Sequence, residues 1–167
     1  RLDSVWKMTQ DKRGAIWFTG PRGALKFNGY SSHFYPLDYA RDIVCTQNGE
    51  IWVVANFGLF RYSSVKDDFE QIIGSGSRPE HGRYFDVNGI IEGEGGDLWL
   101  ASSDDNPFVY NRKSATLRSI KLPSNRARYS RSLEFHRGLD GQVYAARENE
   151  LYYLEDGSLK PLLIREK

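Results

Sequence analysis

Cysteine is nearly absent from this sequence: Cys45 is the one cysteine among 167 residues. A lone cysteine excludes an internal disulfide and leaves the redox compartment of the protein undecided. The three histidines, His33, His81 and His136, are scattered along the chain, which argues against a zinc cluster. We expect no bound metal and no cofactor.

Long apolar runs and an excess of one charge are missing as well. The longest runs, Ala15–Phe18 and Ile51–Ala55, are far shorter than the roughly 20 residues that cross a bilayer. With 23 basic and 22 acidic side chains the net charge is +1, whereas nucleic acid and anionic lipid are bound through concentrated positive charge. We therefore expect no nucleic-acid partner, and we expect any export signal or membrane segment to lie outside this sequence.

What the sequence does contain is a repeat. Four tetrapeptides share the pattern glycine, any residue, aliphatic, aromatic, and their aromatic residues lie 35, 47 and 45 positions apart. A period of this size is typical of proteins built from repeated supersecondary units. The tetrapeptides are Gly14-Ala15-Ile16-Trp17, Gly49-Glu50-Ile51-Trp52, Gly96-Asp97-Leu98-Trp99 and Gly141-Gln142-Val143-Tyr144.

Each repeat also offers four short apolar runs separated by turn-forming residues. The first run is Val5–Met8 in the first repeat and Ile43–Cys45 in the second. β-Branched and aromatic residues recur in these runs, and no stretch carries apolar side chains at helical spacing with caps. The pattern predicts an all-β protein, a single segment of β-propeller with four four-stranded antiparallel blades at about residues 1–37, 38–76, 77–123 and 124–167.

The repeated aromatic residue has a structural explanation. A blade has two apolar faces and no core of its own, so one large flat side chain per blade fills the space between neighbouring sheets. We therefore expect Trp17, Trp52, Trp99 and Tyr144 to be core residues.

A second motif begins six residues after the first two tryptophans, as Gly23-Ala24-Leu25-Lys26-Phe27 and Gly58-Leu59-Phe60-Arg61-Tyr62. Together with the Gly-x-Ile-Trp tetrapeptide, this arrangement resembles the two-component regulator propeller repeat. The resemblance covers the whole chain as four consecutive repeats. The third and fourth repeats depart from the pattern, because residues 102–106 and 147–150 replace the glycine-bearing loop.

The resemblance implies a periplasmic sensor domain of a bacterial signalling protein, placed ahead of a membrane helix and a histidine kinase or another regulator. It implies binding of a small ligand or oligosaccharide without catalysis, any enzymatic activity residing in an output domain. The sequence itself holds no kinase motif and no phosphate-binding glycine-rich loop. Two other functions stay open: a protein-interaction or dimerisation scaffold, and a propeller lyase or hydrolase with side chains converging at the channel mouth.

The order of the apolar runs indicates whether the four blades close into a complete propeller ring. Each repeat starts with its inner strand and ends with its outer strand, and no exchange of a strand between the termini is visible. We therefore expect a sector of a larger propeller, whose end faces stack on further blades of the parent chain. Uncovered end faces expose contiguous apolar area, so homodimerisation is expected as well.

Ligands of propellers usually meet the loops at one mouth of the central channel. Three loops that lead from an outer strand to the next inner strand combine tyrosine with arginine, which suits a sugar and equally suits a protein partner. The structural alternative is that the tyrosines pack on the blade rims and the arginines are solvated. The predicted ligand-binding residues are Tyr39, Arg41, Arg83, Tyr84, Phe85, Tyr129 and Arg131.

The loops between the second and third runs contribute Arg22, Asn56 and the cluster Asp104-Asp105-Asn106. Adjacent carboxylates and an amide can hold Ca²⁺, but a full site takes six or more oxygen ligands. The sequence does not assemble that number, so we interpret the cluster as an exposed turn.

Overall fold

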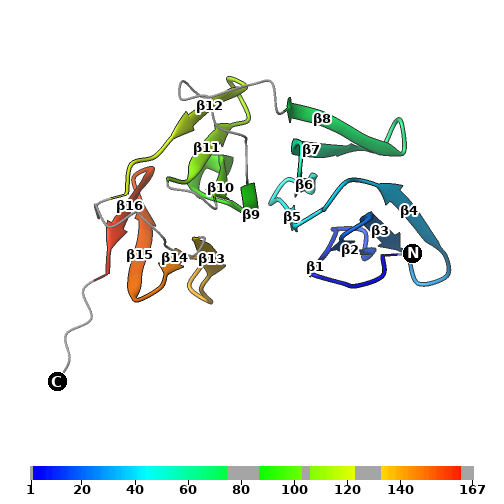
Figure 1. Ribbon diagram of the computed structural model, residues 1–167, viewed down its shortest axis with the longest axis horizontal. Helices are drawn as coiled ribbons and strands as arrows, with labels where there is room; N and C mark the ends of the chain where they lie inside the picture. Colours follow the sequence, from blue (N-terminus) through cyan, green and yellow to red (C-terminus); the bar gives the residue numbers. More distant parts are fainter. Residues whose placement is uncertain (1, 75–86, 103–105, 123–132, 163–167) are drawn as a thin grey trace. The chain divides into compact units, whose positions relative to one another are not determined.

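The computed structural model describes residues 2–74, 87–102, 106–122 and 133–162. Within these ranges the regular elements are sixteen β-strands and one short 3-10 turn, η1 (Glu94–Gly96). The strands form four four-stranded sheets, each built from four consecutive strands (Figure 1). Strands that are neighbours in a sheet pair antiparallel. The expected fold class is confirmed.

The strands are four to seven residues long and follow one another through short turns. The first sheet holds β1 (Lys7–Gln10), β2 (Ile16–Gly20), β3 (Gly23–Phe27) and β4 (Ser32–Pro36). The second holds β5 (Asp42–Cys45), β6 (Ile51–Ala55), β7 (Gly58–Ser63) and β8 (Asp68–Gly74). The third holds β9 (Val87–Glu92), β10 (Leu98–Ser102), β11 (Phe108–Asn111) and β12 (Thr116–Ser119). The fourth holds β13 (Glu134–Arg137), β14 (Val143–Arg147), β15 (Glu150–Glu155) and β16 (Ser158–Pro161).

Residues 1–90 and 91–167 form two compact units. The first unit contains the first two sheets, the second contains β10 to β16, and β9 spans the division. Two of the expected blade boundaries, near residues 76 and 123, lie outside the described residues, so the exact division into blades stays a prediction.

The glycine of each tetrapeptide belongs to the same five-residue turn in every repeat. The backbone N–H of the turn's first residue donates to the carbonyl of its fifth, and the glycine at its fourth position donates back to the carbonyl of the first. These glycines have φ between +84° and +88°, a conformation that costs glycine little and other residues more. The turns span residues 11–15, 46–50, 93–97 and 138–142. The repeated aromatic residue follows each turn by two positions, so the turn determines which face of the sheet it takes.

The glycine that begins the second motif is required for a different reason. Gly58 has φ +139°, and a Cβ placed there would lie 1.7 Å from the carbonyl oxygen of Ile73 on β8. Gly23 has φ +144° and meets the carbonyl oxygen of Tyr35 on β4 at 2.1 Å in the same way. At this position the outer strand passes so close to the third strand that no side chain fits.

The core of the first unit contains residues of both of its sheets. Trp17 is fully buried (0% exposed); its ring stacks on Tyr35 at 5.6 Å between centroids and meets Tyr62 edge-on at 4.7 Å. The indole N–H of Trp17 donates to Oδ2 of Asp11 at 2.9 Å. The buried ring therefore keeps a hydrogen-bond partner, as buried polar atoms require.

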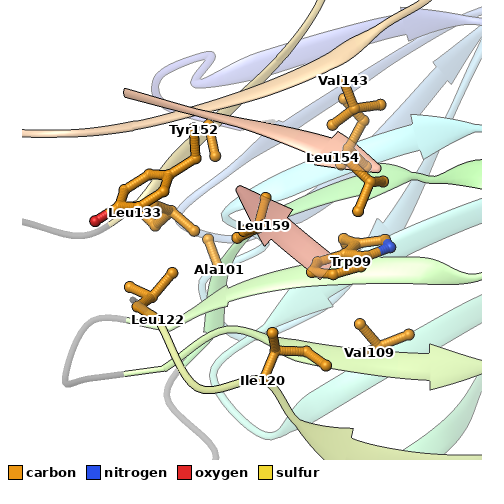
Figure 2. Packing of buried hydrophobic residues seen from close by; sticks show 12 residues of the cluster. Trp99, Ala101, Val109, Ile120, Leu122, Leu133, Val143, Tyr152, Leu154 and Leu159 are labelled. Atoms are coloured by element: carbon orange, nitrogen blue, oxygen red, sulfur yellow. The ribbon is translucent and has the colours of Figure 1, made fainter. Parts of the chain in front are cut away.

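The core of the second unit is mainly aliphatic and surrounds the indole ring of Trp99. Trp99 is 2% exposed and lies among Val109, Leu154 and Leu159, which come from β11, β15 and β16 (Figure 2). Gly93 lies directly against this ring, since a Cβ there would come within 2.5 Å of it. The cluster also contains Ile91, Ala101, Ile120, Leu122, Leu133, Val143, Ala145 and Tyr152.

The four repeated aromatic residues do not share one environment. Trp17, Trp52 and Trp99 are at most 2% exposed. Tyr144 departs from the expectation of a core residue: it is half-buried, and its hydroxyl donates to Oδ2 of Asp140 at 3.3 Å. The phenol oxygen of Tyr144 keeps a polar partner in the turn between β13 and β14, which a fully apolar site would not provide.

Candidate ligand-binding face

Two aromatic side chains lie exposed at one end of the first unit. Trp6 directly precedes β1, and Tyr39 lies in the connection from β4 to β5. Their ring centroids are 6.0 Å apart with the rings tilted by 36°, and Trp6 is 41% and Tyr39 48% exposed. We call these two residues the Trp6–Tyr39 pair; it is an aromatic surface that a flat or ring-shaped ligand can cover.

The backbone holds both members of the pair in place. The N–H of Trp6 donates to the carbonyl of Thr19 at 2.9 Å, which extends the pairing of β1 with β2. The N–H of Tyr39 donates to the carbonyl of Pro21 at 3.0 Å, and Tyr39 itself has φ +50°. A non-glycine residue in this region is uncommon. Hydrogen bonds to the first sheet therefore hold the connection in a specific shape at Tyr39.

A chain of polar side chains belongs to the same connection. The guanidinium of Arg41 donates to Oδ1 of Asn56 at 2.9 Å, and the amide of Asn56 donates to Oδ2 of Asp38 at 3.0 Å. The backbone N–H of Asn56 also donates to the carbonyl of Asp38 at 2.9 Å. These contacts link two segments: the connection between β4 and β5, and the turn between β6 and β7. The side chains of Asp38, Asn56 and Arg41 form one hydrogen-bonded row.

Trp6 and Arg41 occupy equivalent positions of two successive repeats. Trp6 directly precedes β1, and Arg41 directly precedes β5. Each donates its backbone N–H to the carbonyl of the residue two positions after the repeated tryptophan, which is Thr19 for Trp6 and Val54 for Arg41. The repeat therefore presents an indole at this position in the first blade and a guanidinium in the second. Both groups are typical of binding surfaces.

The structure places two of the seven predicted ligand-binding residues. Tyr39 and Arg41 both lie at this face, although the Arg41 side chain is engaged with Asn56. The other five, Arg83, Tyr84, Phe85, Tyr129 and Arg131, lie outside the described residues, as do Asp104 and Asp105. Asn106 is described, and its side-chain oxygen accepts from the N–H of Leu122 at 3.1 Å. In the described part of the chain no cluster of His, Cys, Asp and Glu has the geometry of a metal site.

Trp6 is the residue of this face that the sequence did not reveal. It lies in the run Val5–Met8, which we expected to be the first strand, but β1 begins only at Lys7. Val5 and Met8 are exposed as well, so the run is not a buried strand. One sequence feature could have indicated that Trp6 belongs to this face: when the two repeats are aligned, Trp6 stands at the position that Arg41 has in the second repeat.

A half-buried carboxyl group, that of Asp42, lies at the start of β5. Asp42 accepts the N–H of Ile43 at Oδ1 (2.8 Å) and that of Ile90 at Oδ2 (3.0 Å). Burial raises the pKa of this carboxyl above its usual value, and the two backbone donors only partly oppose the increase. Both oxygens of Asp42 are therefore engaged in holding backbone, which is a structural role.

No family model matches the chain, and no curated protein matches it by sequence. The repeat family suggested by the motifs is thus not established by these comparisons. In the described residues there is also no helix with the length and apolarity of a membrane span.

Solved structures with the same fold occur at low sequence identity. Virginiamycin B lyase from Staphylococcus aureus has a TM-score of 0.76 at 18% identity, over 98% of this chain and 57% of the lyase chain. The extracellular domain of a protein assigned as a hybrid two-component system in B. thetaiotaomicron has a TM-score of 0.68 at 21% identity, over 97% of this chain and 22% of that one. An auxiliary nutrient binding protein from Bacteroides ovatus has a TM-score of 0.70 at 12% identity, over 99% of this chain and 43% of that one.

The chain therefore spans a little over half of the lyase chain and about a fifth of the two-component protein's extracellular chain. The expectation that the domain is without catalysis is wrong as an inference from this fold, because one of the similar structures is an enzyme. The fold is also that of extracellular domains of two-component systems. These likenesses establish the architecture: the chain consists of β-propeller blades, a fold that serves enzymes and sensors alike.

Proposed function

We propose that this chain is part of an extracytoplasmic sensor domain of a bacterial signalling protein, and that it binds a saccharide at the Trp6–Tyr39 pair. The observation that carries the proposal is the exposure of two adjacent aromatic rings beside the hydrogen-bonded row Asp38, Asn56 and Arg41. Binding at this face is relayed to a kinase or another regulator elsewhere in the parent protein.

The chemistry of the face suits a sugar. The C–H faces of a pyranose stack on aromatic rings, and the hydroxyls at the ring edge need both donors and acceptors. Asp38 offers carboxylate oxygens, and Arg41 offers a planar set of N–H donors. Because these side chains are already held by one another, little conformational entropy is lost when a ligand binds.

The comparisons support the proposal without extending it to a particular ligand. The extracellular domain of a two-component system and an auxiliary nutrient binding protein both have this fold. The remaining predicted residues, Tyr84 and Tyr129 among them, would belong to the equivalent loops of the later repeats, and further blades of the parent chain would complete the ring. Homodimerisation remains part of the proposal.

Tryptophan fluorescence gives a direct test. Of the four tryptophans, Trp6 is exposed and the other three are buried, so a ligand that covers Trp6 shifts the emission to shorter wavelength. We would titrate the whole chain with cellohexaose, xylohexaose, maltohexaose and arabinohexaose. The expected result is a saturable blue shift with at least one of them. The absence of a saturable change with all four would contradict the proposal.

Calorimetry on variants locates the site. We expect Trp6→Ala and Tyr39→Ala each to weaken binding by about tenfold, which is the size of one aromatic stacking contact. Tyr30→Ala is the matched control, because Tyr30 is 99% exposed and lies in the turn between β3 and β4. Equal affinities for Trp6→Ala, Tyr30→Ala and the unchanged chain would mean that the saccharide binds elsewhere.

A further inference from the structure

The first unit contains a cleft at the opposite ends of its strands from the Trp6–Tyr39 pair. Trp6 precedes β1, whereas the turn that begins at Asp11 follows it. This turn, the corresponding turn before β6 and the turn between β7 and β8 enclose a cleft of about 630 Å³. Its charged lining residues are Asp11, Lys12, Arg13, Lys26, Glu50 and Arg61. Four of these six side chains are basic.

The two acidic side chains of the cleft are engaged within the protein. Asp11 accepts the N–H of Arg13 (2.9 Å) and of Ala15 (3.0 Å) at Oδ1, and the indole N–H of Trp17 at Oδ2. Glu50 accepts the indole N–H of Trp52 at 3.2 Å and lies 3.8 Å from Nη1 of Arg61. Both carboxylates therefore serve the turns and the repeated tryptophans, and Arg61 is neutralised locally.

Lys26 is placed differently. Its ammonium lies 5.1 Å from the ring centroids of both Trp17 and Tyr62 and donates to the Tyr62 hydroxyl at 3.4 Å. The Tyr62 hydroxyl in turn donates to Asp67 at 2.5 Å. Among the described residues no carboxylate lies within ion-pair distance of Lys26. The aromatic rings fix the position of the half-buried ammonium. The Asp67 carboxylate, whose pKa Lys26 helps to lower, acts on this charge without forming an ion pair with it.

Lys12 and Arg13 add two cations at the rim of the cleft. Both are exposed, and within the described ranges neither forms an ion pair. The side chain of Lys12 lies over Gly49, where a Cβ would come within 3.4 Å of it. A side chain from the first sheet's turn is thus held across the turn of the second sheet. Ser63 and Ser64 line the same cleft and contribute hydroxyl donors.

We propose that this cleft binds an oxyanion, namely a carboxylate, sulfate or phosphate group of a small ligand, with Lys26, Arg13 and Lys12 as its charged donors. Charge-assisted hydrogen bonds to an anion are stronger than neutral ones, and the guanidinium fork of Arg13 suits two oxygens of one group. The site is separate from the Trp6–Tyr39 pair and does not depend on saccharide binding there.

The test uses the whole chain at constant ionic strength. Sodium sulfate, sodium phosphate and sodium citrate would each be titrated against a sodium chloride background, with binding followed by isothermal titration calorimetry. We expect saturable binding of at least one of the three, and the ranking of the three identifies the oxyanion. Heats that never exceed those of chloride, or that rise linearly without saturation, would overturn the proposal.

Variants decide whether the binding occurs in the cleft. We expect Lys26→Met to weaken binding by about tenfold, equivalent to about 1.4 kcal/mol, because it keeps the aliphatic stem between the rings and removes the charge. Lys113→Met is the matched control, since Lys113 is an exposed lysine in the turn between β11 and β12. Trp6→Ala should leave anion binding unchanged. Equal weakening by Lys26→Met and Lys113→Met would mean a diffuse charge effect and would refute the site.

A second variant covers the case in which Lys26→Met does not fold. Arg13 is exposed and is not a member of the first unit's core cluster. Arg13→Gln is expected to fold and to weaken binding of the same anion several-fold. If both variants fold, the proposal is refuted when neither substitution changes the affinity for the anion. If Lys26→Met does not fold, an unchanged affinity in Arg13→Gln alone refutes it.

Discussion

The hydroxyl of Tyr35 donates a 2.8 Å hydrogen bond to the carboxylate of Asp67, which lies 32 residues later in the chain. Tyr35 is on β4 of the first sheet, and Asp67 is in the turn before β8 of the second. The hydroxyl of Tyr62 donates to the same oxygen atom. Burial is the largest cause that raises the pKa of Tyr35, followed by the hydrogen bond to Asp67. One carboxylate therefore joins the outer strand of the first sheet to the second sheet.

Removal of the Tyr35 hydroxyl tests this connection. We expect Tyr35→Phe to lower the free energy of unfolding by about 1 kcal/mol, the typical net value of one hydrogen bond, while the ring continues to stack on Trp17. Urea denaturation followed by tryptophan fluorescence measures the change. Tyr30→Phe is the control, because that hydroxyl is on an almost fully exposed side chain. An equal effect of the two substitutions would show that the hydrogen bond to Asp67 contributes nothing.

The same carboxylate predicts a pH dependence. The two tyrosine hydroxyls hold the pKa of Asp67 below its ordinary value of 3.8. A carboxyl with a lowered pKa in the folded state contributes stability above its unfolded pKa, and this contribution is lost as the pH falls through the folded pKa. We therefore expect the stability difference between the unchanged chain and Asp67→Asn to be largest above about pH 5 and to shrink toward pH 2. Asparagine accepts the positive φ of this position, so the backbone is not the cause.

Denaturation curves at a series of pH values check this prediction. A difference that stays constant from neutral to acidic pH would show that the charge of Asp67 is irrelevant and that only its shape matters. A difference that grows on acidification would contradict the direction of the pKa change.

The repeated aromatic positions should differ in their cost of truncation. Trp17→Ala removes a fully buried ring and should cost about 3–5 kcal/mol. Tyr144→Ala removes a half-buried ring, and we expect well under half of that loss. Chemical denaturation of the two variants, followed by far-ultraviolet circular dichroism, compares them directly. Equal losses would mean that Tyr144 is packed as tightly as the tryptophans.

Substitution of two glycines by alanine distinguishes the cost of a strained backbone conformation from the cost of a steric clash. At Gly14 (φ +88°) a Cβ would meet no atom within 4 Å, whereas at Gly58 it would collide with the backbone of Ile73. Gly14→Ala should therefore cost about 1–2 kcal/mol, the penalty for a left-handed residue. Gly58→Ala should cost more, because β8 must move away from β7. Thermal unfolding ranks the two variants, and a smaller loss at Gly58 would contradict the close approach of the strands.

The sequence was sufficient for the features that repeat. Trp17 and Gly14 have counterparts at a regular interval, so period and turn chemistry together predict the sheets. Trp6 was missed because a tryptophan between a valine and a lysine is typical of a β-strand. The structure shows that β1 begins one residue later, at Lys7, and that the Trp6 side chain is exposed. The cleft around Lys26 was missed because its walls come from turns of two repeats, which meet only when the sheets pack together. Neither feature has a local sequence pattern.

The constancy of the five-residue turn has a consequence for how such a chain can diversify. One extra residue between Asp11 and Ala15 would shift β2 by one position against β1 and turn Trp17 toward the opposite face. The connection from β4 to β5, residues 37–41, joins two different sheets, so its length does not determine the register within either sheet. An insertion there would alter the local hydrogen bonds of this connection but not the pairing of β3 with β4 or of β5 with β6, so a new recognition surface can arise at this place while both sheets stay the same.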